Sequence, residues 1–131
     1  KGGWECGERN VLQKLGVPFV VMNTGFTWET QNREQDKLAC EQTWLAAEKV
    51  LADPNIDMVL LDELTYMVAY DYLDLERVLS ALKNRPAHQH VIITGRGCHR
   101  ALVELADTVS EVQPIKHAFE AGVKAQAGFD Y

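Results

Sequence analysis

Residues Met58 to Glu63 read Met-Val-Leu-Leu-Asp-Glu, an apolar run that ends abruptly in two adjacent carboxylates. An apolar run of this length is typical of a strand that is buried on both faces, in a parallel sheet covered by helices. Successive side chains of a strand point to opposite faces, so Asp62 and Glu63 share one environment only where the strand has turned into its loop. We therefore expect both carboxylates at the carboxyl edge of the sheet, where open α/β sheets bind their ligands.

Two hypotheses account for this acidic strand end. In nucleotide-binding sheets an acidic residue at this place holds Mg²⁺ against phosphate oxygens, directly or through water, because a hard cation prefers oxygen ligands. In the alternative, Asp62 caps the next turn and Glu63 is a solvated side chain. The hexapeptide by itself is compatible with both.

The overall composition restricts the class of protein. The chain has 131 residues, 47% hydrophobic and 24% charged, which predicts a single α/β domain over residues 1–131. A formal net charge of -6, without a block of Lys or Arg, argues against nucleic acid as a partner. No apolar stretch approaches membrane-spanning length and nothing resembles a signal peptide, so we expect no membrane partner and a cytoplasmic location. Three widely spaced cysteines without a C-x-x-C pair predict reduced thiols.

Apolar periodicity predicts helices and strands in alternation. Helices are expected over residues 8–15, 32–52, from about 74 to 84, and 100–105, and strands over residues 18–22, from residue 58, 90–94 and 108–112. The longest helix is expected to bury a stripe formed by Cys40, Trp44, Ala47 and Leu51. Residues 64–70 are too apolar for an exposed loop and are expected to pack across the sheet edge. At least four strands that alternate with helices imply a parallel, doubly wound α/β fold.

Aromatic side chains follow the predicted strand over residues 18–22. Phe26 and Trp28 occupy a loop in which small and polar residues are usual. The two rings either pack under the next helix or line a pocket.

A glycine-rich loop follows the predicted strand over residues 90–94. Gly95 and Gly97 flank Arg96, so the backbone can approach a ligand closely, and the guanidinium matches phosphate geometry. Such turns between a strand and a helix are also common without a ligand. In the tail, Lys116 and His117 either face a ligand or form a solvated surface pair.

With these residues in place, the chain resembles the P-loop type of ATP:corrinoid adenosyltransferase over essentially its entire length. Several distinctive sequence motifs occur in the same order as in that family. This set of motifs is far more specific evidence than a lone acidic strand end. They are TGFTWET at residues 24–30, LDELTYMVAYDY at 61–72, ITGRG at 93–97, KHAF at 116–119 and GVKAQ at 122–126.

The resemblance implies a P-loop NTPase fold of the RecA-like type and a reaction between ATP and a corrinoid, which is cobalamin or a precursor. The 5′-deoxyadenosyl group of ATP is transferred to Co(I) and triphosphate is released, in adenosylcobalamin biosynthesis or salvage. The resemblance also implies a homodimer and a reducing flavoprotein that supplies Co(I).

The resemblance also implies roles for individual residues. Glu63 corresponds to the family's Mg²⁺ ligand, with Asp62 as its support. Phe26 and Trp28 correspond to rings that face the corrinoid, where an apolar wall offers the cobalt no axial ligand and so makes it easier to reduce. The candidates for contacts to the phosphates or ribose of ATP are Arg96, Lys116 and His117.

This sequence departs from the family in one respect. The family begins with a strand and a G-x-x-x-x-G-K-[ST] loop that holds triphosphate, and no such motif occurs here. We therefore expect that the first strand, loop and helix, about sixty to seventy residues, are missing, and that residues 1–131 are the C-terminal two thirds of an adenosyltransferase domain. These residues alone are expected to expose a long apolar edge and to be inactive. The alternatives are a non-catalytic corrinoid-binding fragment and another RecA-like P-loop ATPase, the latter opposed by the acidic charge and the aromatic loop.

Overall fold

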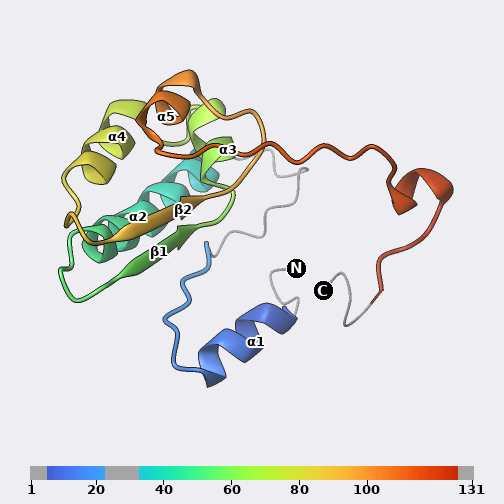
Figure 1. Cartoon of the computed structure of the whole chain (residues 1–131), viewed down its shortest axis with the longest axis horizontal. Helices are drawn as coiled ribbons and strands as arrows, with labels where there is room; N and C mark the ends of the chain where they lie inside the picture. Colours follow the sequence, from blue (N-terminus) through green and yellow to red (C-terminus); the bar gives the residue numbers. More distant parts are fainter. Residues whose placement is uncertain (1–5, 23–32, 127–131) are drawn as a thin grey trace. The chain divides into compact units, whose positions relative to one another are not determined.

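The computed structural model describes residues 6–22 and 33–126, and the chain divides into two compact units (Figure 1). Residues 21–107 form the larger unit, and residues 1–20 together with 108–131 form the smaller one. The larger unit contains both described strands and all of the helices between them.

The larger unit alternates helices and strands in the order that the periodicity predicts. Its elements are α2 (Arg33–Leu51), β1 (Met58–Leu61), α3 (Leu64–Ala69), α4 (Leu75–Lys83), β2 (His90–Ile93) and α5 (Arg100–Leu105). The predictions of α2, α4, α5 and the two strands are confirmed, with small shifts at their ends. The sequence analysis does not predict α3, which occupies the stretch expected only to pack across the sheet edge.

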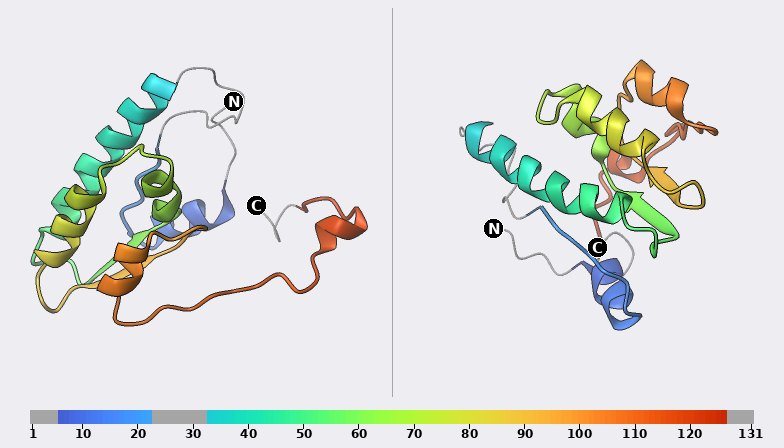
Figure 2. Two further views of the ribbon diagram at one scale, coloured as in Figure 1. Left: turned by 90° about the horizontal axis from the view of Figure 1, so that it is seen from above. Right: turned by 90° about the vertical axis from the view of Figure 1, so that its left-hand side faces the viewer.

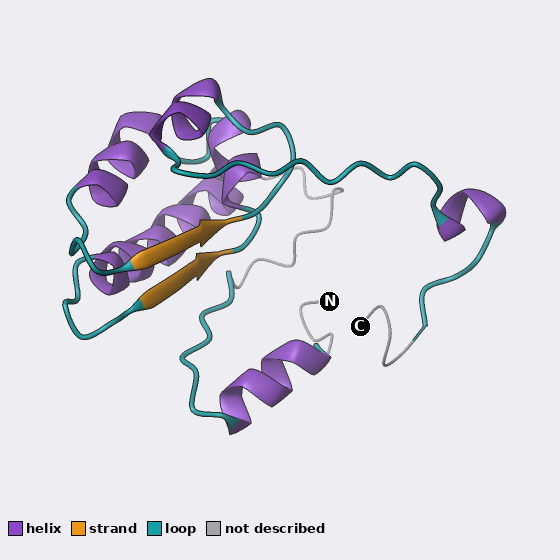
Figure 3. Cartoon of the chain, viewed as in Figure 1, coloured by secondary structure: helices purple, strands orange, loops and turns teal. Residues whose placement is uncertain are grey.

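The two strands form a parallel sheet, shown as adjacent arrows in Figure 3. Their register pairs Met58 with His90 and Leu61 with Ile93. Since both strands run in the same direction, α3 and α4 provide the crossover between them, as a parallel pair requires. The α/β class and the parallel pairing are therefore confirmed. The prediction of at least four strands is not, because the described residues form a two-stranded sheet.

Only one face of this sheet is covered by the described residues. Val59 is 6% exposed and belongs to the core, whereas Met58 and Leu60 are 60% and 57% exposed. The prediction that this strand is buried on both faces is therefore wrong for the described part of the chain. The physical reason is that the helices pack on the face that carries Val59, and the alternation of side chains turns Met58 and Leu60 the other way.

Helix α2 contributes the predicted apolar stripe to the core. Cys40, Trp44 and Leu51 are almost completely buried and Ala47 packs against the same cluster. The indole Nε1 of Trp44 donates a hydrogen bond to Glu48 at 2.8 Å, so its polar atom is satisfied within the helix. Helix α4 lies beside α2, as the two views of Figure 2 show.

Helix α4 begins next to Asp74, close to the start that the sequence predicts. The side chain of Asp74 accepts a hydrogen bond from the backbone N–H of Arg77 at 3.0 Å. This bond satisfies a donor that has no partner within the helix. The buried face of α4 is formed by Val78, Leu79 and Leu82.

The smaller unit contains α1 (Gly7–Lys14) and the 3₁₀ helix η1 (Ala118–Ala121). Helix α1 ends before Gly16, which has φ of 77°. The N–H of Val17 bonds the carbonyl of Leu12 and that of Gly16 bonds the carbonyl of Gln13, which together form a Schellman motif. Neither helix has a buried residue.

The strands predicted over residues 18–22 and 108–112 are not formed. No backbone hydrogen bond among the described residues involves residues 18–22. A strand requires a neighbour that accepts and donates its backbone hydrogen bonds, and β-branched composition by itself supplies no such neighbour. Within the described ranges, no helix has both the length and the apolar character needed to cross a membrane.

Candidate functional site

The candidate site lies where β1 and β2 end side by side. The ladder continues one residue beyond the paired strands, because the N–H of Thr94 bonds the carbonyl of Leu61 at 3.2 Å. This register places Asp62 next to Thr94 at the carboxyl edge of the sheet. The expected position of the acidic pair at this edge is therefore confirmed.

The hydroxyl group of Thr94 joins the two strand ends. Its Oγ1 donates a hydrogen bond to Oδ1 of Asp62 at 2.6 Å and accepts one from the backbone N–H of Glu63 at 3.0 Å. A single side chain directly after β2 thus contacts both residues of the acidic pair that follows β1.

Glu63 occupies an unusual backbone conformation. Its φ and ψ are 57° and 22°, in the left-handed region that residues other than glycine rarely adopt. Glu63 is also the N-cap residue of α3, and its side chain makes no capping hydrogen bond. The carboxylate is exposed and has no hydrogen bond or ion pair within the described residues. Its oxygens are therefore available to a ligand.

The loop after β2 packs tightly against the start of α3. Thr65 is buried, and its Oγ1 donates a hydrogen bond to the carbonyl of Arg96 at 2.9 Å. Gly95 has φ of 141° and lies directly against the Thr65 side chain. Gly97 also has a positive φ, 61°, but no close neighbour. The two glycines thus shape the loop that presents Arg96, whose side chain is exposed.

The structure brings together three of the seven residues predicted for the site. Asp62, Glu63 and Arg96 lie on the adjacent loops that follow β1 and β2. Phe26 and Trp28 lie outside the described residues. Lys116 and His117 belong to the smaller unit.

In the smaller unit, one ring nitrogen of His117 has a structural partner. Nδ1 accepts a hydrogen bond from the N–H of Phe119 at 3.1 Å and so caps η1. His117 therefore has only Nε2 left for a ligand. Lys116 has no ion pair within the described residues.

Thr94 and Thr65 are site residues that no motif in the sequence predicts. Both hydroxyl groups bridge residues that are 31 or 32 positions apart in the chain, and the bridges depend on the register of the two strands. One feature of the sequence could have indicated Thr94: it is the first residue after β2, as Asp62 is the first residue after β1.

No group of three or more potential metal-binding His, Cys, Asp or Glu side chains occurs in residues 6–22 and 33–126. A metal at the acidic strand end therefore cannot be held by a cage of described side chains alone.

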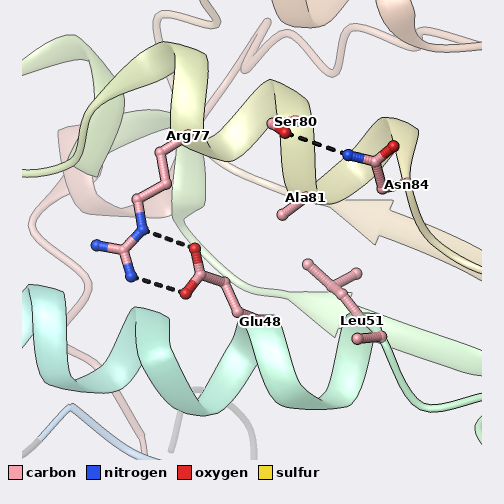
Figure 4. Close-up of a pocket in the computed structure, with 7 residues that line it drawn as sticks. Glu48, Leu51, Arg77, Ser80, Ala81 and Asn84 are labelled. Atoms are coloured by element: carbon pink, nitrogen blue, oxygen red, sulfur yellow. Dashed lines mark hydrogen bonds and ion pairs between the residues drawn. The ribbon is translucent and has the colours of Figure 1, made fainter.

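A separate cleft of about 330 Å³ lies between α2 and α4 (Figure 4). Glu48 and Arg77 face each other at its wall, with paired bonds of 2.6 and 2.7 Å from the guanidinium to the carboxylate. The Arg77 guanidinium lowers the pKa of Glu48. Because both charged groups are satisfied by each other and by Trp44, this cleft is part of the packing between two helices.

Burial has its clearest electrostatic effect at Cys40. Desolvation, together with the nearby charge of Glu41, raises the pKa of the Cys40 thiol to about 11. The thiol is therefore protonated and unreactive in the folded protein. Cys98 is exposed, and partial desolvation raises its pKa as well. Neither thiol has the depressed pKa of a nucleophile.

The chain is similar to known proteins over its whole length. The family model described as ATP:corrinoid adenosyltransferase BtuR/CobO/CobP matches residues 1–131. The corrinoid adenosyltransferase CobA of Salmonella typhimurium (strain LT2) is 68% identical over 131 residues, which are 100% of this chain and 67% of that protein.

Two further relatives carry the same description. The corrinoid adenosyltransferase of Escherichia coli K12 is 67% identical over 100% of this chain and 67% of its own length. That of Pseudomonas aeruginosa PAO1 is 45% identical over 100% of this chain and 66% of its own length. The chain thus spans about two thirds of the length of these relatives.

Proposed function

The chain belongs to the ATP:corrinoid adenosyltransferase family, and we propose that its protein transfers the 5′-deoxyadenosyl group of ATP to the cobalt of a corrinoid. A cobalt–carbon bond forms at C5′, the bond from C5′ to the phosphate oxygen breaks, and triphosphate leaves with the electron pair. The observation that carries this proposal is the match of the family model to all of residues 1–131. The finer fold that we propose is a doubly wound P-loop NTPase of the RecA-like type, supported by the parallel pair β1 and β2 with its helical crossover.

The acidic strand end fits a magnesium ion. Asp62 and Glu63 offer carboxylate oxygens, which are hard donors, and the Glu63 carboxylate has no other partner in the described part of the chain. We assign Glu63 as the ligand and Asp62 as its support, with one Asp62 oxygen already bonded to Thr94. When bound, Mg²⁺ would supply positive charge beside the triphosphate.

The loop after β2 fits an anion. Arg96 is exposed, has no ion pair in the described part of the chain and is flanked by two glycines with positive φ. Its guanidinium can donate paired hydrogen bonds to phosphate oxygens and so hold the leaving group in line. Lys116 and Nε2 of His117 are proposed to contact the phosphates or the ribose.

The corrinoid is assigned to the aromatic loop. Phe26 and Trp28 would form an apolar wall that excludes water and offers the cobalt no axial ligand, which favours its reduced state. We further propose that the protein is a homodimer and that a reducing flavoprotein supplies the electron for Co(I). These assignments rest on the family membership.

The products of ATP test this function directly. The full-length protein is mixed with ATP, Mg²⁺ and a corrinoid reduced to Co(I). It should form adenosylcorrinoid and triphosphate in equal amounts. Chromatography separates triphosphate from ADP and phosphate. Formation of ADP and phosphate without adenosylcorrinoid would indicate an ATPase and overturn the proposal.

The substitution Glu63→Gln tests the metal assignment. It removes the charge but keeps the shape, so we expect the rate at fixed Mg²⁺ to fall by about 10²-fold or more, the loss typical of removing one group that stabilises developing charge. Glu76→Gln is the matched control, because Glu76 is also exposed but lies on α4. If both variants kept the unaltered rate, Glu63 would not be the ligand.

A further inference from the structure

The Thr94 hydroxyl group both donates and accepts a hydrogen bond at the strand ends. A hydroxyl has one hydrogen to donate and lone pairs to accept. A carboxylate only accepts and a backbone N–H only donates, so the Thr94 hydrogen points to Oδ1 of Asp62 and its oxygen accepts from Glu63. These complementary bonds, at 2.6 and 3.0 Å, fix the hydroxyl in a single orientation.

The hydrogen bond that Thr94 accepts comes from a residue with an unfavourable backbone conformation. The φ of 57° is a conformation that costs an L-residue energy, and the surroundings must compensate for that cost. Thr94 contacts the N–H of this same residue. Without the hydroxyl, the turn could relax toward an ordinary conformation, and the Glu63 carboxylate would then point elsewhere.

The donated bond orients the other carboxylate. With Oδ1 held by Thr94, the remaining oxygen of Asp62 is fixed relative to Glu63. Groups that bond to metal ligands in this way set the direction of the ligand, and their substitution typically lowers metal affinity or activity by about 10- to 100-fold.

We propose that Thr94 is a positioning residue, which holds the Asp62–Glu63 turn in the geometry that binds Mg²⁺ with ATP. This inference rests on the proposed function, because it requires a metal at Glu63. Thr94 itself contacts neither substrate nor metal. Its position directly after β2, at the start of the loop that carries Arg96, also links the metal side of the site to the phosphate side.

The test compares the Thr94→Val and Thr94→Ser variants of the full-length protein. Valine replaces the hydroxyl by a methyl group of similar size, whereas serine keeps both hydrogen bonds. Thr43→Val is the matched control, because Thr43 is also half-buried and its hydroxyl bonds a carbonyl at 2.9 Å, but within α2. Glu63→Gln is included as the variant that lacks the proposed ligand.

The first measurement is the binding of Mn²⁺, as a probe for Mg²⁺, in the presence of ATP by electron paramagnetic resonance. We expect Thr94→Val to weaken Mn²⁺ binding by about 10- to 100-fold, as loss of a group behind a ligand typically does. Thr94→Ser and Thr43→Val should bind Mn²⁺ like the unaltered protein. Adenosylation by Thr94→Val should recover at high Mg²⁺, so that the metal requirement rises while the maximal rate is largely kept.

Each outcome decides between the assignments. If Glu63→Gln loses Mn²⁺ but Thr94→Val does not, Glu63 remains the ligand and the role of Thr94 is overturned. If Thr94→Ser is as impaired as Thr94→Val, the hydroxyl is not responsible and the inference also fails. If Glu63→Gln binds Mn²⁺ normally, the metal assignment fails together with the inference. Thermal unfolding of all variants separates these effects from a general loss of stability.

Discussion

Gly95 lies so close to Thr65 that a Cβ at position 95 would overlap the Thr65 hydroxyl group. The φ of Gly95, 141°, is also one that side chains with a Cβ rarely adopt. Lack of space and backbone conformation therefore both require glycine at this point. The contact fixes the loop that carries Arg96 against the first turn of α3.

Gly95→Ala is expected to lower the free energy of unfolding by about 2 to 4 kcal/mol, from overlap and backbone strain together. Urea denaturation measures the change. Gly97→Ala is the matched control, since Gly97 has φ of 61° but open space around it, and should cost only about 1 kcal/mol. Equal losses in the two variants would show that the contact with Thr65 contributes nothing.

Arg96→Ala is expected to weaken ATP binding by about tenfold or more, because it removes charge-assisted hydrogen bonds to phosphate. Arg96→Lys should restore part of the affinity, since lysine keeps the charge but lacks the paired donors. Isothermal titration calorimetry with MgATP checks both. The control is Arg100→Ala, because Arg100 is already paired with Glu104 at 2.7 Å, and an unchanged affinity in Arg96→Ala would remove Arg96 from the site.

Gln89 joins the end of α2 to the start of β2. Its side chain is 1% exposed, and Nε2 lies 3.1 to 3.3 Å from the carbonyls of Val50, Asp53 and Ile56. The carbonyls of Val50 and Asp53 also accept backbone N–H groups, but Gln89→Leu removes the Gln89 donor from the carbonyl of Ile56. We therefore expect a loss of about 1 to 3 kcal/mol in the free energy of unfolding. Gln42→Leu, on the exposed face of α2, should be nearly neutral. Chemical denaturation that found the two variants equally stable would contradict this role.

The pair of Glu48 and Arg77 predicts a pH dependence of stability. Arg77 lowers the pKa of Glu48 in the folded state below its unfolded value, which is about 4.3. The contribution is therefore fully present above the unfolded pKa and is lost as the pH falls through the lowered folded pKa. Glu48→Gln should lower the melting temperature at pH 7, and the difference from the unaltered protein should shrink below about pH 4.

The control for this pH dependence is Glu104→Gln. Glu104 pairs with Arg100 in the i,i+4 arrangement, but both side chains are largely exposed. Such pairs contribute little, so the melting temperature should change little at either pH. A difference for Glu48→Gln that stays constant down to pH 2 would show that the carboxylate charge is not the cause.

Local patterns of residues were enough to predict most helices, both strands of the sheet and the chemistry of the strand ends. The stripe of Cys40, Trp44 and Leu51 predicted α2, and apolar periodicity placed the start of α4 near residue 74. Both signals act within a few positions of the chain. The pattern after β1 also placed Asp62 and Glu63 at the carboxyl edge. The family membership followed from sequence motifs and not from the geometry of the site.

Which of these elements pair, and which side chains meet, depends on the folded arrangement of the chain. The apolar composition of residues 18–22 predicted a strand, yet no neighbour among the described residues takes its hydrogen bonds. The bond from Thr94 to Asp62 spans 32 positions, and it exists because a helical crossover brings two parallel strands into one register. Contacts of this kind depend on where distant parts of the chain come to lie, which no local pattern of residues specifies.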